Sequence, residues 1–303
     1  MHELLRRYGV TLSAVIICLV GFWLLCLVVL PNITLLQFSF RPYLPVDQLG
    51  GPDDHYTLKN YATFLSGDPA FYILGIPISI HLKIFLLTVL FSSMVTVVAL
   101  VVSYPLAFYL AKVIKPANAP TVFLMLLIPL WVSEILRSFA WFIVLAYQGP
   151  LNAMLSVVGI GPIRWISGFN GVIIGLVYTY VLFMLFPIYN AITSLDTNQI
   201  EAAQDLGAPL WRTHWRVVIP HAKPGIASGC VMVFMLSAGS IIVPSILASP
   251  GSRWFTQIIQ QWMFEGQDWN TGSAYAFLLL VLCTVFVSLM MRLLNVRLVD
   301  IAK

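Results

Sequence analysis

Six stretches of almost uninterrupted apolar residues decide what this chain can fold into, because each is long enough to cross a bilayer as a helix. A transmembrane α-helix needs about 20 predominantly apolar residues. Of the 303 residues, 60% are hydrophobic and only 9% are charged, whereas soluble domains carry about 25% charged residues. These proportions predict an all-α integral membrane protein with six transmembrane helices, and they exclude a soluble enzyme, a nucleic-acid binder and a disordered chain. The predicted spans cover residues 10–30, 84–111, 119–146, 171–192, 225–247 and 273–291.

The distribution of Lys and Arg between the spans predicts the orientation of the chain. On one side of the membrane the loops and termini carry ten of them: Arg6, Arg7, Lys112, Lys115, Arg212, Arg216, Lys223, Arg292, Arg297 and Lys303. The other side carries four or five: Arg41, Lys59, Arg164, Arg253 and, at a boundary, Lys83. Because cytoplasmic loops hold the excess of Lys and Arg, both termini are expected in the cytoplasm.

The loops differ in character. The outer loop 31–83 mixes aromatic residues with turn formers, which predicts a folded cap on the outer surface. The longest cytoplasmic loop is 194–223. The cysteines at positions 18, 26, 230 and 283 lie inside apolar runs without any metal-binding spacing. Buried, unpaired thiols are therefore expected, and neither a disulfide nor a metal site is predicted.

Helix signals in that cytoplasmic loop predict two short helices outside the membrane. Asn198 followed three residues later by Glu201 resembles a capping box, which would start the first helix. Gly207 lies where a left-handed C-terminal cap is needed. Pro209 suits the first turn of a second helix, and Pro220 would end it.

The same loop resembles the E-A-A-x-x-x-G-x9-I-x-L-P loop of binding-protein-dependent ABC importer permeases of the type I, MetI-like superfamily. The E-A-A and glycine positions match in register, and Val217-Val218-Ile219-Pro220 takes the I-x-L-P end with two conservative replacements. In that family the loop docks into a cleft of the cytoplasmic ATPase. The alternative is an ordinary amphipathic loop helix. The resemblance assigns ATPase coupling to Glu201, Ala202, Ala203, Asp205, Gly207, Arg212, Arg216 and Pro220.

Two further stretches resemble the spermidine/putrescine permease branch of this family. Residues 103–111 are similar to its G-Y-P-L-A-Y-x-L-A stretch, with Ser103 in place of the glycine. Residues 129–141 are similar to P-x-W-x-S-x-L-x-R-x-x-A-W. Permeases for thiamine, ferric iron, phosphonates and opines share much of this pattern, so it indicates a branch and not a ligand.

Glu134 and Arg137 are the only opposite charges within a predicted span. Ionisable groups in a membrane face a cavity or a partner, and at i and i+3 these two can pair with each other. Alternatively, Glu134 attracts a cationic substrate, or the charges lie at an interface near the outer membrane edge. Aromatic rings bind ammonium groups, but Trp residues also anchor spans at the membrane surface, and small residues in the fifth span also serve helix packing. The candidate pathway residues are Trp131, Glu134, Arg137, Trp141, Tyr180, Ser237 and Ser240.

The resemblance implies a type I ABC importer transmembrane domain in the bacterial inner membrane. The chain has no G-x-x-x-x-G-K-[ST] phosphate loop, so it is expected to be non-catalytic and to bind no cofactor or metal itself, with ATP and Mg on a separate subunit. The implied partners are a second homologous permease, two copies of the ABC ATPase, a periplasmic substrate-binding protein and membrane lipid, but no nucleic acid. The expected cargo is a polyamine; an opine, a phosphonate, thiamine or another small nutrient is the alternative. A polytopic membrane channel or enzyme is the different-class alternative.

Overall fold

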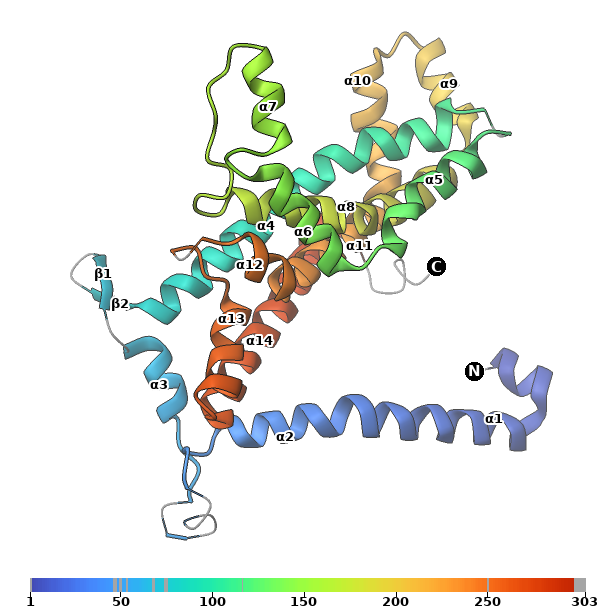
Figure 1. Ribbon diagram of the computed structural model, residues 1–303. Coiled ribbons are helices and arrows are strands. Elements are labelled where there is room, and N and C mark those ends of the chain that lie inside the picture. Colours follow the sequence, from blue (N-terminus) through green and yellow to red (C-terminus); the bar gives the residue numbers. More distant parts are fainter. Residues whose placement is uncertain are drawn as a thin grey trace. The chain divides into compact units, whose positions relative to one another are not determined.

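The computed structural model describes residues 2–45, 48, 51–52, 54–66, 69–73, 76–115, 117–249 and 251–296. Apart from one two-stranded hairpin, the secondary structure of these residues is helical (Figure 1). Six stretches among the described residues are long and apolar enough to cross a membrane, as the sequence predicts. They are Thr11–Ser39, Ile80–Val113, Glu134–Val157, Asn170–Thr193, Leu210–Ala238 and Trp269–Leu294.

The chain divides into two compact units. The first combines Met1–Ser79 with Ile259–Leu278, and the second combines Ile80–Ile258 with Leu279–Lys303. The long helix α14, Trp269–Leu294, contributes to both, and it follows α13, Phe255–Gln260, and the π-helical turn η5, Gln261–Glu265.

In the first unit, the first span is longer than predicted. Helix α1, His2–Leu24, continues through the π-helical turn η1, Leu25–Val29, into α2, Leu30–Ser39. Pro31 does not end it, because it lies in the first turn of α2, where a missing N–H is tolerated. The outer loop therefore begins nine residues later than predicted and contains α3, Lys59–Ser66, and the antiparallel strands β1, Pro69–Ile73, and β2, Ile76–Ser79.

Two asparagines bind the C-terminal end of α2. The Asn60 side-chain amide donates to the carbonyls of Ser39 and Arg41 at 3.0 and 2.9 Å. The Asn270 amide donates to the carbonyls of Phe38 and Arg41 at 3.2 and 3.1 Å. These bonds satisfy helix-end carbonyls that have no partner within the helix, so this part of the outer loop is folded onto the span.

The second unit is built around three helices in contact with one another: α4, Ile80–Phe108, α8, Asn170–Thr193, and α11, Ile219–Ala238. A Cβ on Gly225 would lie 2.4 Å from the Pro187 carbonyl oxygen, and one on Gly229 would lie 2.7 Å from the Met184 sulfur. Small residues of this kind let membrane helices approach backbone to backbone. The close contact between α8 and α11, called here the α8–α11 seam, depends on these two glycines.

We expect Gly225→Ala to destabilise the protein by about 3 kcal/mol or more, because the added methyl group must push against a backbone carbonyl rather than a flexible side chain. The matched control is Gly251→Ala, since a Cβ there meets no atom within 4 Å. Thermal unfolding of both variants in detergent measures the effect. Equal midpoints would contradict this account of the seam.

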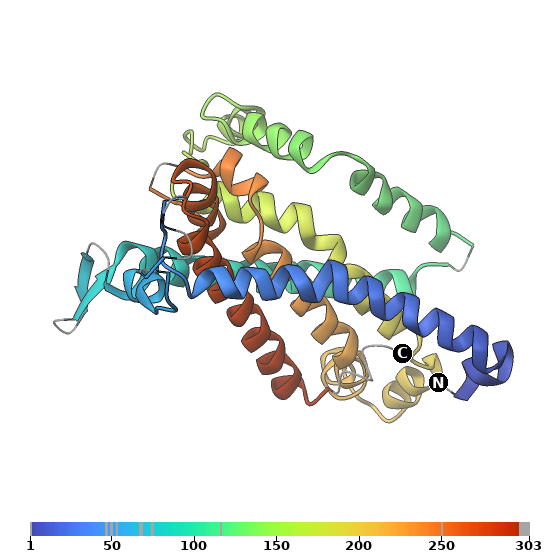
Figure 2. The same cartoon turned by 90° about the horizontal axis from the view of Figure 1, so that it is seen from below.

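The third apolar stretch, predicted as one helix over 119–146, is broken into two. Helix α5, Ala119–Trp131, is separated from α6, Glu134–Leu145, by two extended residues, and the pair appears in green in Figure 2. Pro129 lies in the last turn of α5 and has no N–H to continue the helical ladder. A short helix, α7, Pro150–Val157, follows α6.

The fifth span is also broken, whereas the sequence predicts one helix over 225–247. Helix α11 ends at Ala238, and α12, Ile242–Leu247, follows after the turn at Gly239 and Ser240. The Trp254 indole N–H donates to the Ser237 carbonyl at 3.0 Å, and the Thr256 hydroxyl donates to the Ser240 carbonyl at 2.5 Å. A break is tolerated at membrane depth when neighbouring side chains satisfy the freed carbonyls.

Candidate functional site

The loop between α8 and α11 contains two short helices that are joined at a glycine, as predicted. These are α9, Thr197–Asp205, and α10, Leu210–Thr213. Gly207 between them has φ +78°, which confirms the predicted left-handed position.

Three details of that loop differ from the prediction. The N-cap of α9 is Asp196, whose carboxylate accepts from the Asn198 N–H at 3.0 Å, so the Asn198–Glu201 capping box is wrong. Asp and Asn are similarly good caps, and sequence spacing does not rank them. Pro209 precedes α10 and does not lie within it. Pro220 ends no helix, because α10 continues through the π-helical turn η4, His214–Val218, into the first turn of α11.

The surface of this loop is unusually apolar. The side chains of Leu206 and Leu210 are 89% and 68% exposed, and those of Trp211 and Trp215 are also exposed. Exposed apolar residues gathered on a loop mark an interaction site. With the exception of the half-buried Ala203, the residues predicted to contact the ATPase are exposed beside them: Glu201, Ala202, Asp205, Gly207, Arg212, Arg216 and Pro220.

A polar cluster within the spans brings together four of the predicted pathway residues. The Tyr180 hydroxyl, on α8, donates a hydrogen bond to the Glu134 carboxylate at 3.0 Å. The Ser240 side chain, at the break after α11, lies near Tyr180, but its buried hydroxyl has no hydrogen-bond partner among the described residues; the charge of Arg137 also acts on Tyr180. Glu134 is the first residue of α6, where the positive end of the helix dipole stabilises a carboxylate. Three segments that are distant in sequence thus meet around one acidic group.

The predicted ion pair between Glu134 and Arg137 does not form. Among the described residues, the salt bridge with an N···O distance within 4.0 Å joins Arg41 to Asp54 in the first unit. Glu134 and Arg137 form none. Glu134 instead bonds to Tyr180 on the neighbouring helix, while the Arg137 Nε is buried and has no hydrogen-bond partner among the described residues. The carboxylate is therefore bound by the Tyr180 hydroxyl and forms no direct ion pair among the described residues.

The other three predicted pathway residues lie outside this cluster. Trp131 ends α5 and is 89% exposed. Trp141 packs against Tyr178, with ring centroids 5.3 Å apart. Ser237 is fully buried, and its hydroxyl donates to the Phe234 carbonyl at 3.0 Å. Of the two interpretations left open for Ser237, helix packing fits these contacts.

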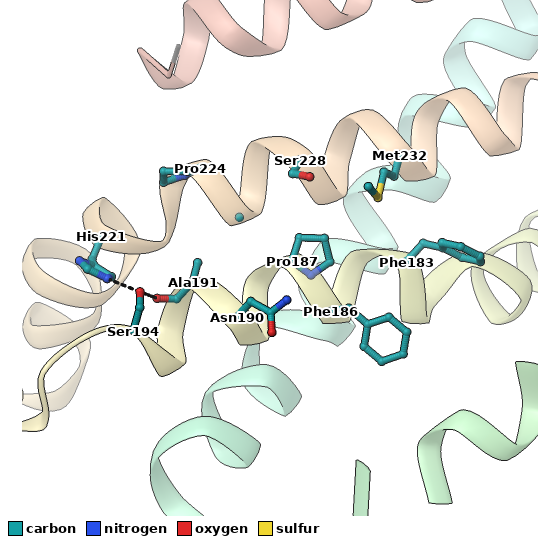
Figure 3. Close-up of a pocket in the computed structure, with 11 residues that line it drawn as sticks. Phe183, Phe186, Pro187, Asn190, Ala191, Ser194, His221, Pro224, Ser228 and Met232 are labelled. Atoms are coloured by element: carbon teal, nitrogen blue, oxygen red, sulfur yellow. Dashed lines mark hydrogen bonds between the residues drawn. The ribbon is translucent and has the colours of Figure 1, made fainter. Parts of the chain in front are cut away.

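A cavity of about 840 Å³ lies between α8 and α11 (Figure 3). Among its lining residues, Phe183, Pro187 and Asn190 follow Tyr180 along α8 at spacings of three and four. Together these four residues form one face of the helix, called here the α8 stripe, and the sequence of the fourth span already contains this pattern. At one end, the Ser194 hydroxyl and the His221 Nε2 are hydrogen-bonded at 3.1 Å. The eleven lining residues include no Asp, Glu, Lys or Arg: Phe183, Phe186, Pro187, Asn190, Ala191, Ser194, His221, Pro224, Gly225, Ser228 and Met232.

The α8 stripe connects the polar cluster to this cavity. The rings of Tyr180 and Phe183 lie 6.3 Å apart. Pro187 has no N–H, so the usual helical bond to the Phe183 carbonyl is not made. A carbonyl released in this way is a ligand for cations in membrane transport proteins. The stripe therefore offers aromatic rings and a backbone oxygen in succession, and at its Tyr180 end it meets the Glu134 carboxylate of α6.

Among the described residues, no group of three or more His, Cys, Asp or Glu side chains is placed to hold a metal ion. The four cysteines are free.

Six spans, a polar cluster within the bundle and an exposed apolar loop together define the membrane subunit of a transport complex. The chain belongs to the family described as "Binding-protein-dependent transport system inner membrane component", which matches residues 5–300. It is therefore a multi-pass inner-membrane permease subunit of an ABC importer, a class of subunit that is not catalytic. This membership excludes the channel and membrane-enzyme alternatives.

Individual relatives cover nearly the whole chain. It is 32% identical over 299 residues to the spermidine/putrescine transport system permease protein PotB of Salmonella typhimurium (strain SL1344), covering 96% of this chain and 97% of that protein. It is 31% identical over 268 residues to the protein of the same name from Escherichia coli (strain K12), covering 88% and 91%. A bacterial ABC transporter that imports the acidic polysaccharide alginate shares the fold, with a TM-score of 0.65, 18% identity and 97% of both chains covered.

Proposed function

We propose that this permease forms one half of the membrane pathway of an ATP-driven importer of polyamines such as spermidine and putrescine. The carboxylate of Glu134, which meets Tyr180 inside the bundle without an ion pair, is the observation that carries the choice of cargo. A polyamine is a chain of ammonium groups separated by methylene segments. Carboxylates and aromatic faces attract ammonium groups, and apolar surface accepts the methylene segments.

The same proposal implies an order in which the cargo meets the residues of the α8 stripe. Cargo released by a periplasmic binding protein meets Glu134 and Tyr180 first, then passes Phe183 toward Asn190 and the cavity of Figure 3. No carboxylate lines the cavity, so a cation is held there less tightly than at Glu134 and leaves on the cytoplasmic side.

The partners follow from the apolar loop. Its exposed surface around Leu206 and Trp211 docks onto one of two cytoplasmic ATPase copies, which bind ATP and Mg, while this chain binds no cofactor. A second, homologous permease completes the pathway. The excess of Lys and Arg in this loop and its neighbours supports a cytoplasmic location for it and for both termini.

Deletion of this chain should abolish uptake of labelled spermidine and putrescine in cells that lack other polyamine carriers, because the pathway is then incomplete. The wild-type gene should restore uptake, and a tagged wild-type chain should co-purify an ABC ATPase. Unchanged polyamine uptake, with the ATPase still co-purifying, would overturn the cargo and direct the search to opines, phosphonates or thiamine. Absence of any ATPase would overturn the importer complex itself.

A further inference from the structure

The second span contacts the coupling loop, defined here as residues 194–223, at two places, one before α9 and one after α10. Helix α4 continues into the π-helical turn η3, Tyr109–Val113. Lys112 in this turn donates hydrogen bonds to the carbonyl of Leu195, just before α9, and to that of Thr193 at 3.4 Å. At the other end, the Tyr104 hydroxyl and the Nδ1 atom of His214, just after α10, lie 2.8 Å apart.

An aromatic contact reinforces the second attachment. The Phe108 ring meets the His214 ring at a centroid distance of 4.4 Å and an interplanar angle of 62°. Tyr104 and Phe108 are one helical turn apart on α4 and therefore share a face. His214 begins the π-helical turn η4, so the contact falls where the loop becomes the fifth span.

These contacts matter because α4, unlike α8 and α11, is not joined directly to the coupling loop by the backbone. The coupling loop is covalently continuous with α8 and α11, so a force on the loop reaches those helices through the backbone. Helix α4 is the third member of the same core, but its end lies more than 80 residues before the loop in sequence. It can follow the loop only through non-covalent contacts. Pro105, beside Tyr104, has no N–H and therefore interrupts the hydrogen-bond ladder of α4 near the end that contacts the coupling loop.

We infer that Tyr104 and Lys112 form a clasp, attached at His214 and Leu195, that makes α4 move with the coupling loop. The clasp rests on the proposed function, in which this loop docks onto the ATPase. Both residues are positioning residues, since they touch neither cargo nor ATP. Removal of the Tyr104–His214 or the Lys112–Leu195 hydrogen bond uncouples ATP hydrolysis from transport and leaves the ATPase bound.

The test measures spermidine uptake and ATP hydrolysis in the same proteoliposomes, which hold the complete importer and its loaded binding protein. Tyr104→Phe removes one hydroxyl and keeps the ring, and Lys112→Gln removes the charge. Each should lower the spermidine carried per ATP by about tenfold, within the usual range of coupling between sites. The ATPase should co-purify in wild-type amounts with both variants.

Tyr109→Phe is the matched control, because Tyr109 is 51% exposed in the adjacent turn and has no hydrogen bond through its hydroxyl among the described residues. It should leave the ratio unchanged. Tyr104→Phe combined with His214→Ala should be no worse than His214→Ala alone if the two groups act through one bond. Wild-type spermidine per ATP in Tyr104→Phe and Lys112→Gln would overturn the clasp alone. A wild-type chain that binds no ATPase would overturn the proposed function, and the clasp with it.

Discussion

Gly207→Pro is expected to abolish uptake while the protein remains in the membrane. Gly207 has φ +78°, and its N–H donates to the Gln204 carbonyl at 2.8 Å. Proline fixes φ near −65° and has no N–H, so α9 and α10 cannot keep their observed arrangement. Because Gly207 lies outside the six apolar stretches, their insertion should be unaffected. Uptake, membrane abundance and ATPase co-purification together measure the effect.

The conservative replacement Gly207→Asn is the control for this prediction. Asparagine enters the left-handed region far more readily than other side chains, and a Cβ at this position meets no atom within 4 Å. Uptake should therefore stay near the wild-type rate. Equal losses in the asparagine and proline variants would mean that the surface of the glycine, and not its backbone angle, is what the ATPase requires.

Glu134→Gln is expected to lower the rate of polyamine uptake by about 10- to 100-fold. Glutamine keeps the size of the side chain and still accepts from Tyr180, but it removes the negative charge. A hydrogen bond to a charged group contributes about 1.5–3 kcal/mol, which corresponds to that range of rate. Assembly with the ATPase should be retained, because Glu134 lies within the bundle and not on the coupling loop.

Two tyrosines of α8 provide a matched comparison for the same site. Tyr180→Phe removes the hydroxyl that holds the Glu134 carboxylate and should reduce uptake, although less than Glu134→Gln does. Tyr178→Phe changes a side chain that packs on Trp141 and should have little effect. Normal uptake by Glu134→Gln would return Glu134 to a structural role and remove the basis for a cationic cargo.

The spans could be predicted because contact with lipid is set by the composition of each segment. The break in the fifth span could not, since the turn at Ser240 is stabilised by Trp254 and Thr256 from a later segment, whereas the break in the third has a local cause in Pro129. The same limit explains the error at Glu134. Spacing within one helix reveals Arg137 three residues away, whereas the partner actually used, Tyr180, is on another helix. In the coupling loop, local chemistry fixed the bend at Gly207 but not the choice between Asp196 and Asn198 as the cap.

The close seam at Gly225 and Gly229 has a mechanical consequence. Because α8 and α11 approach each other closely there, we expect them to resist sliding past each other and to tilt as one unit when the coupling loop moves. Helix α8 has 24 residues and is therefore about 36 Å long. A tilt of about 5° about the end of α8 next to the loop displaces the other end of this helix by about 3 Å, enough to widen or close a passage for a slender cargo. A small movement of the loop would thus produce a larger displacement at the far end of α8.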